Sequence, residues 1–246
     1  MNFTNREPTD WKDLQNLVAK YFNEAGYSAI TPYEIETVRG KVEVDVFVQA
    51  EMELSKVILC ECKLWKTKIT KEKVHAFRTV VSDSGASLGI IISKIGFQKG
   101  AIQAAENSNI ELKTWEEFLS MIYDRWLTSR IIYLKRKVAP LGVYMDPMDM
   151  PCEKLSSEDK NKYFELIEKY SKVQSIVWML SKEHFLQDMR RFPVYKSVCL
   201  DVPELFINFL AYQAEEALKS FRKVFAGIDI PKYKFDLPDA YALMNL

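Results

Sequence analysis

Three ionisable residues of this chain are spaced so that they could form one catalytic centre. Glu61 and Lys63 lie two residues apart at the end of KVILCECK, a β-branched and apolar run of strand length, so both side chains leave one face of the expected strand. Asp45 lies in the extended stretch before it. If the intervening turn centres on Glu53, Asp45 lies opposite Glu61, with Cβ atoms about 4.5–5.5 Å apart.

Two carboxylates at that separation repel each other strongly unless a cation lies between them. Mg²⁺ prefers such oxygen ligands and completes its shell with water and substrate phosphate. The set therefore suits phosphodiester hydrolysis, in which a metal stabilises charge on the phosphate and lowers the pKa of a bound water. Lys63 would orient that water or stabilise the developing pentacovalent phosphate. Cys60 and Cys62 are expected on the opposite face, in the core.

The Glu-x-Lys pattern alone carries no weight, because both residues are common and chance occurrences are expected. A second instance, Glu111-Leu112-Lys113, has no strand-borne aspartate a hairpin away. What favours the first instance is its place at the end of an apolar strand, where burial of unpaired charge is costly.

Basic residues follow the candidate centre and are opposed only by Glu72: Lys63, Lys66, Lys68, Lys71, Lys73 and Arg78. Such residues neutralise phosphates and give sequence-independent, salt-sensitive affinity. Trp65, in the same segment, could stack on a base or enter a groove. A run of this kind is also typical of a solvated helix face, so its position beside the metal candidate is what favours nucleic-acid binding.

Local signals predict the elements that must position these residues. An opening helix follows the N-cap candidate Asp10 and ends at Gly26. After it we expect extended stretches at 28–38 and 42–49, strands at 56–63, 88–93 and 110–112, and helices at 70–82, 97–107 and from 115 to about 137. This order predicts an α/β fold, a mixed sheet flanked by helices on both faces.

The rest of the chain is predicted to be mainly helical and carries no recognisable chemistry. Three prolines and two aspartates interrupt the segment APLGVYMDPMDMP, which is typical of a linker. We therefore expect a catalytic domain at 1–136, a linker at 137–155 and a helical domain at 156–246. The aromatic residues of that last domain recur at helical spacing, which indicates core packing or a partner interface.

Composition bounds the class of protein. The 34 Lys+Arg balance 34 Asp+Glu, which argues against a wholly basic nucleic-acid binder. No apolar run is long enough to span a bilayer, and the N-terminus lacks the apolar region of a secretory signal. The 4 cysteines are too few for a disulfide framework. We expect a cytoplasmic protein with reduced thiols and no membrane partner.

The first half of the chain also resembles a known family. Asp45 followed by Glu61-Cys62-Lys63 resembles the D…(D/E/Q)-x-K signature of the PD-(D/E)xK nucleases, and within them the Mrr-like restriction endonuclease family is the most similar. The matching segments occur in the family's order: LQNLVAKYFNEAGY, then Val74 and Phe77, then LGIIISKIGFQKGAIQAAENSNIEL.

The resemblance implies a restriction-endonuclease-like fold and a Mg²⁺-dependent endonuclease, with Mn²⁺ as a substitute, acting on double-stranded DNA in restriction or antiviral defence. The implied metal ligands are Asp45, Glu61 and the backbone carbonyl of Cys62. Gln15 stands where the family usually has glutamate, and one glycine of the family's Gly-Gly-x-Asp loop is missing. Gln15 offers a carbonyl oxygen but no charge to hold a second metal, so one metal per site is expected, although Glu43, on the same expected strand face as Asp45, would partly compensate.

One centre per chain predicts a dimer or larger assembly, since a double-strand break needs two, or a partner in a defence complex bound through the C-terminal helices. Two alternatives remain open. One is a catalytically inactive nuclease-fold module, favoured by Gln15, that binds DNA or a protein partner in a larger defence or repair complex. The other is a structural or signalling subunit in which the helical half carries the function.

Overall fold

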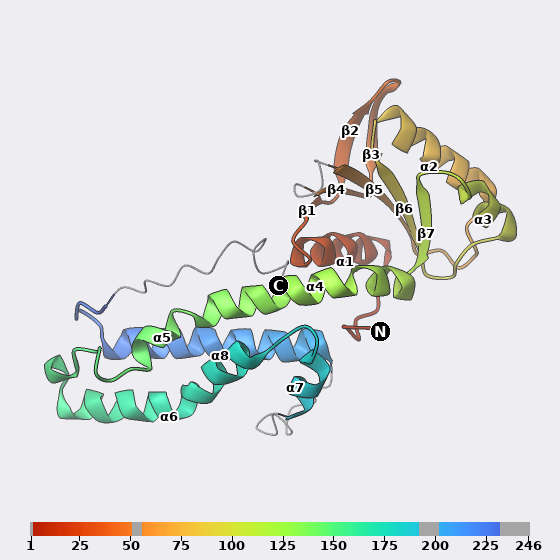
Figure 1. The fold of residues 1–246 in the computed structure, drawn as a ribbon. Helices are drawn as coiled ribbons and strands as arrows, with labels where there is room; N and C mark the ends of the chain where they lie inside the picture. Colours follow the sequence, from red (N-terminus) through yellow and green to blue (C-terminus); the bar gives the residue numbers. More distant parts are fainter. Residues whose placement is uncertain (1, 51–55, 192–201, 232–246) are drawn as a thin grey trace. The chain divides into compact units, whose positions relative to one another are not determined.

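The computed structural model describes residues 2–50, 56–191 and 202–231, which divide into two compact units, Met1–Trp126 and Leu127–Leu246 (Figure 1). The division falls inside helix α4 (Trp115–Val138), earlier than the boundary after residue 136 that the sequence analysis expected. No helix among the described residues is long and apolar enough to cross a membrane.

The first unit is a mixed five-stranded sheet with helices against it. Its elements are α1 (Trp11–Glu24), β1 (Ser28–Ile30), β2 (Tyr33–Thr37), β3 (Gly40–Val44), β4 (Val46–Ala50), β5 (Lys56–Lys63), α2 (Lys71–Asp83), β6 (Leu88–Ser93), α3 (Lys99–Ala105), β7 (Ile110–Thr114) and the start of α4. The strand order is β1-β4-β5-β6-β7, antiparallel from β1 to β5 and parallel from β5 to β7. The predicted α/β class and mixed sheet are confirmed, with α1 on one face and α2 and α3 on the other (Figure 1).

Helix α1 begins and ends where its capping residues predict. The Asp10 side chain accepts a hydrogen bond from the Asp13 N–H at 2.8 Å, which satisfies a free donor of the first turn. At the other end Gly26 has a φ of 85°, and the Tyr27 N–H donates to the Phe22 carbonyl at 3.0 Å. This is a Schellman ending, in which glycine adopts the left-handed conformation without strain. The buried face of α1 packs against β1, β4 and β5.

The two extended stretches expected after α1 are each broken into two strands, which corrects the prediction. β1 and β4 pair in the main sheet, with Ala29 opposite Val48, whereas β2 and β3 pair only with each other. One break falls at Pro32, which has no N–H to contribute to a ladder. The other falls at Asp45, whose side chain makes hydrogen bonds of its own. Asp45 therefore lies at a bend between β3 and β4 rather than inside a strand.

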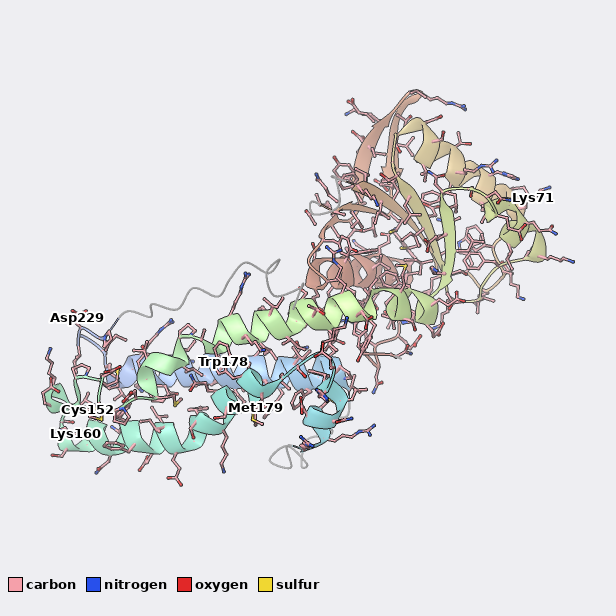
Figure 2. The ribbon with its side chains drawn as sticks, viewed as in Figure 1. Lys71, Cys152, Lys160, Trp178, Met179 and Asp229 are labelled. Atoms are coloured by element: carbon pink, nitrogen blue, oxygen red, sulfur yellow. The ribbon has the colours of Figure 1, made fainter. Side chains whose placement is uncertain are left out.

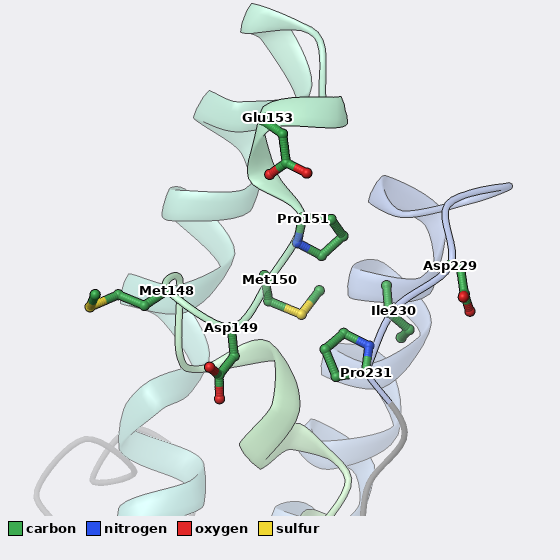
Figure 3. A pocket seen from close by; sticks show the side chains of 8 residues that line it. All are labelled: Met148, Asp149, Met150, Pro151, Glu153, Asp229, Ile230 and Pro231. Atoms are coloured by element: carbon green, nitrogen blue, oxygen red, sulfur yellow. The ribbon is translucent and has the colours of Figure 1, made fainter.

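The second unit comprises the rest of α4 with α5 (Leu141–Tyr144), the 3₁₀ helix η1 (Cys152–Lys154), α6 (Ser157–Met179), α7 (Phe185–Arg191) and α8 (Pro203–Val224). Ser156 caps α6 by accepting the Asp159 N–H at 3.1 Å. An open hollow of about 440 Å³ lies between segments 148–153 and 229–231, where Met150 and Pro151 lie on the side facing Ile230 and Pro231 (Figure 3).

The segment expected to be a linker is packed into this second unit. Leu141 and Tyr144 are buried, and the Tyr144 ring stacks on Phe221 at 5.0 Å between centroids. The Tyr163 hydroxyl, also buried, donates to the Tyr144 carbonyl at 2.9 Å. The first proline, Pro140, therefore does not expose α5, because Tyr144 finds partners on α6 and α8. Met148, between the later prolines, is 94% exposed.

The core under α2 and α3 leaves no room at Gly89. A Cβ there would lie 2.6 Å from both Ile110 Cδ1 and Val81 Cγ2, and 2.9 Å from Phe77 Cε1. We expect Gly89→Ala to lower the free energy of unfolding by about 1–3 kcal/mol through overpacking, measured by urea unfolding. Gly100→Ala is the matched control, since its Cβ meets only Lys71 Cβ, at 3.7 Å. Equal stability of the two variants would contradict this packing.

Candidate active site

The structure brings Asp45, Glu61 and Lys63 together at one end of the sheet. Strands β4 and β5 pair with Val46 opposite Cys60, which is the register that the sequence analysis assumed. Lys63 and Glu61 form an ion pair, and Lys63 Nζ lies 3.7 Å from Asp45 Oδ2. The single ammonium group thus serves both carboxylates, and all three side chains are about one-quarter exposed or less.

Both carboxylate oxygens of Asp45 are held by hydrogen bonds. Gln15 Nε2, from the buried face of α1, donates to Oδ1 at 2.6 Å. The Cys62 N–H donates to Oδ2 at 2.7 Å. The backbone carbonyl of Asp45 in turn accepts from Thr31 Oγ1 at 2.7 Å. Contacts from α1, from β5 and from the segment between β1 and β2 therefore fix the orientation of this carboxylate.

Burial and the neighbouring charges set the protonation of the centre. Burial and the Asp45 carboxylate raise the pKa of Glu61, against the opposing effect of the Lys63 ammonium. Burial alone lowers the pKa of Lys63, but Glu61 and Asp45 outweigh it and raise that pKa above its ordinary value. Lys63 is therefore charged, and it supplies the cation that the two carboxylates need.

Cys60 and Cys62 lie on the opposite face of β5, as predicted, and are buried. Burial raises the pKa of both thiols well above the ordinary range. Their side chains are accordingly protonated core groups rather than nucleophiles or thiolate ligands.

The donor set fits a Mg²⁺ ion held by few protein ligands. Asp45 and Glu61 offer carboxylate oxygens, and Mg²⁺ is commonly bound by one or two carboxylates together with water and phosphate. Within the described residues, no group of three or more His, Cys, Asp or Glu side chains is placed to hold a metal. The expectation for Glu43 is corrected here: it lies exposed in β3 opposite Glu34, and the bend at Asp45 ends the shared strand face.

The basic segment is divided between groups near the centre and groups further along α2. Trp65 is 39% exposed, and its ring centroid lies 5.8 Å from Lys63 Nζ and 5.7 Å from Lys73 Nζ. Lys66, Lys68, Lys71 and Lys73 are all exposed, and Lys71 marks the start of α2 on the surface (Figure 2). Arg78 is instead hydrogen-bonded to His75 Nδ1 at 3.1 Å.

Two parts of this region are not predicted from the sequence. One is Thr31, whose hydroxyl supports the backbone of Asp45. The other is the turn after β6, where Ser93 lies beside Lys63 and the Lys94 N–H donates to the Lys63 carbonyl at 3.4 Å. Parallel strands end at the same sheet edge, so the expected β5–β6 crossover was a usable signal for this turn.

Residues 7–122 match the family model Mrr_cat, described as a restriction endonuclease. They form a domain of the Mrr restriction endonuclease family. The predicted family is thereby confirmed for the N-terminal part of the chain, and the centre described above lies inside the Mrr domain.

Solved structures resemble the chain only distantly. The protein of unknown function AF1548 is 14% identical, with a TM-score of 0.40 over 87% of this chain and 98% of that one. A repair endonuclease from Pyrococcus abyssi is 16% identical, with a TM-score of 0.34 over 46% of this chain and 50% of that one. MspJI restriction endonuclease in complex with a 27-mer oligonucleotide is 15% identical, with a TM-score of 0.30 over 47% of this chain and 28% of that one. Likenesses this distant do not bear on function, and no curated protein matches the sequence.

The Gln15–Asp45 contact predicts how the stability of the Mrr domain changes when a third carboxylate is introduced at position 15. Gln15→Glu would place like charges at a contact that is now 2.6 Å long, lowering the free energy of unfolding without metal by about 1–3 kcal/mol. Mg²⁺ should restore most of that loss, because a cation relieves the repulsion and binds only the folded state. Urea unfolding with and without MgCl₂ measures both effects. Gln15→Met is the control: it loses the hydrogen bond but should gain no extra stabilisation from Mg²⁺, and an equal gain would contradict the prediction.

Proposed function

We propose that this protein is a Mg²⁺-dependent endonuclease that hydrolyses phosphodiester bonds of double-stranded DNA in restriction or antiviral defence. The observation that carries the proposal is the ion-paired set of Asp45, Glu61 and Lys63 within a domain of the Mrr restriction endonuclease family. Asp45, Glu61 and the Cys62 carbonyl would hold the ion, with Mn²⁺ as a substitute. When bound, such an ion stabilises charge on the phosphate and supplies a water of lowered pKa.

The side chains of the chain itself have separable roles in this proposal. Lys63 is a charged donor beside both carboxylates, so it is placed to donate to a phosphate oxygen or to orient the attacking water. Gln15 and the Cys62 N–H keep the Asp45 carboxylate in one orientation before substrate arrives. That pre-organisation removes a reorganisation cost from the reaction.

The exposed lysines and Trp65 would bind the substrate. Lys66, Lys68, Lys71 and Lys73 are free to approach phosphates and neutralise them. Arg78 would contribute only after releasing His75. The second unit would serve assembly: one centre per chain requires two chains to cut two strands, or a partner in a defence complex. The proposed location is the cytoplasm.

Cleavage of plasmid DNA tests the proposed centre directly. We expect the wild-type protein with Mg²⁺ to cut, and Glu61→Ala and Lys63→Ala to lose at least about 10²-fold in rate. The chain contains its own control, Glu111 and Lys113, which form a 3.1 Å ion pair with the same spacing on β7. Glu111→Ala and Lys113→Ala should cut at nearly the wild-type rate.

Two results would contradict the proposal. If the wild type and both centre variants are equally inert on methylated and unmethylated DNA, the Mrr domain is a binding module rather than an enzyme. If the control pair proves as sensitive as Glu61 and Lys63, the assignment of the centre is wrong.

The exposed lysines after β5 predict that the affinity for DNA falls as the salt concentration rises. Each of Lys68→Ala and Lys71→Ala should reduce the slope of log K against log salt by about 0.9, the value for one lost phosphate contact. Fluorescence anisotropy over a salt series measures the slope. Lys172→Ala, an exposed lysine on α6, is the matched control and should leave it unchanged. A slope unaffected by the first two changes would remove these lysines from the DNA-binding surface.

A further inference from the structure

The loops that follow β5 and β6 are fastened to each other on both sides of Trp65. Before it, the Lys94 N–H donates to the Lys63 carbonyl at 3.4 Å. After it, the Ile69 N–H donates to the Gly96 carbonyl at 3.0 Å, and Ile69 also forms a parallel bridge with Phe97. Segment 64–68 and the turn at 94–97 therefore form one surface, which begins at the catalytic candidate Lys63.

Ile95 lies exposed at the tip of the turn after β6, and hydrogen bonds on either side of it fix the backbone of that turn. The buried Ser93 hydroxyl accepts from the Gly96 N–H at 3.1 Å and lies 3.2 Å from the Gly96 carbonyl, to which it donates. Gly96 has a φ of 92°, which favours glycine at this position. Between these two residues Ile95 is 47% exposed. The turn is thus built to hold an apolar side chain rigidly in solvent, two residues beyond the one that pairs with Lys63.

The charge around this apolar pair fits a polyanion. Trp65, on the neighbouring loop, is 39% exposed, and the exposed lysines of the two loops and the adjoining helix starts are Lys66, Lys68, Lys71, Lys94 and Lys99. The acidic groups beside this surface are Asp45 and Glu61, both paired with Lys63, together with Glu72 on α2 and Glu7, whose Oε2 lies 3.9 Å from Lys94 Nζ. Lysines flanking exposed apolar groups match a nucleic acid, whose phosphates are charged and whose base faces are apolar.

We propose, on the basis of the nuclease function proposed above, that Ile95 and Trp65 contact the bases next to the scissile phosphate and open the stack there. An aliphatic side chain entering a base step partly unstacks it, and an indole provides a face for the released base. The free energy of unstacking is paid on binding, so DNA whose stack is already interrupted binds more tightly.

The test compares two short fluorescein-labelled duplexes, one continuous and one with a stable abasic analogue at its centre. Dissociation constants are measured by anisotropy with the full chain and without divalent metal, so that no cleavage is required. The wild type should bind the abasic duplex about tenfold more tightly. The Ile95→Ser, Trp65→Ala double variant should reduce this preference to less than about twofold. Ile102→Ser, at a 51% exposed position on α3, is the control and should keep the full preference.

Equal wild-type affinity for the two duplexes would overturn the inference, as would a preference that survives in the double variant. Thermal unfolding of the double variant at the wild-type temperature shows that the effect is not a loss of fold. The two proposals fail separately. A preference that depends on Ile95 and Trp65, in a protein that leaves plasmid intact with Mg²⁺, supports the base contact and overturns the nuclease activity.

Discussion

The repulsion between the Asp45 and Glu61 carboxylates is the constraint on which the rest of the Mrr domain depends. Burial makes it stronger and raises the pKa of Glu61, so the pair is stable only with a cation beside it. Lys63 is that cation in this structure. The hydrogen bonds from Gln15 and the Cys62 N–H then fix Asp45 from two elements, α1 and β5. Helix α1, the bend at Asp45 and the end of β5 all contribute groups to this charged centre.

The strand pairing of the mixed sheet explains how the charged centre and the two loops beside it come to lie at one edge. The antiparallel pairing of β4 with β5 places Asp45 next to Glu61, while the parallel pairing of β5 with β6 brings two loops to the same edge. Those loops carry Trp65 and Ile95. Acidic, basic and apolar groups thus lie at one edge of the sheet, although the chain as a whole has a formal net charge of zero. The charges are therefore separated locally, which the net charge of the chain does not show.

The second unit shows why prolines that interrupt a sequence pattern are a poor guide to domain limits. Prolines in segment 139–151 interrupt every periodic pattern, yet Leu141 and Tyr144 are buried against the helices around them. The helix expected to end the first domain, α4, instead contributes residues to both compact units. The boundary between two compact units need not coincide with the end of a helix, because different parts of one helix can pack into different cores.

Local chemistry along the sequence was sufficient for much of the fold. Asp10 and Gly26 determined the limits of α1, the apolar runs determined β5 and β6, and the period of a strand placed Glu61 and Lys63 on one face. Only the tertiary structure decided that Asp45 lies at a bend and that Gln15 donates to it. It also decided that Glu43 pairs with Glu34 and that the turn carrying Ile95 is hydrogen-bonded to Lys63. These features depend on contacts between residues far apart in the chain. Which hydrogen-bond partner each polar group takes is decided only when those segments meet.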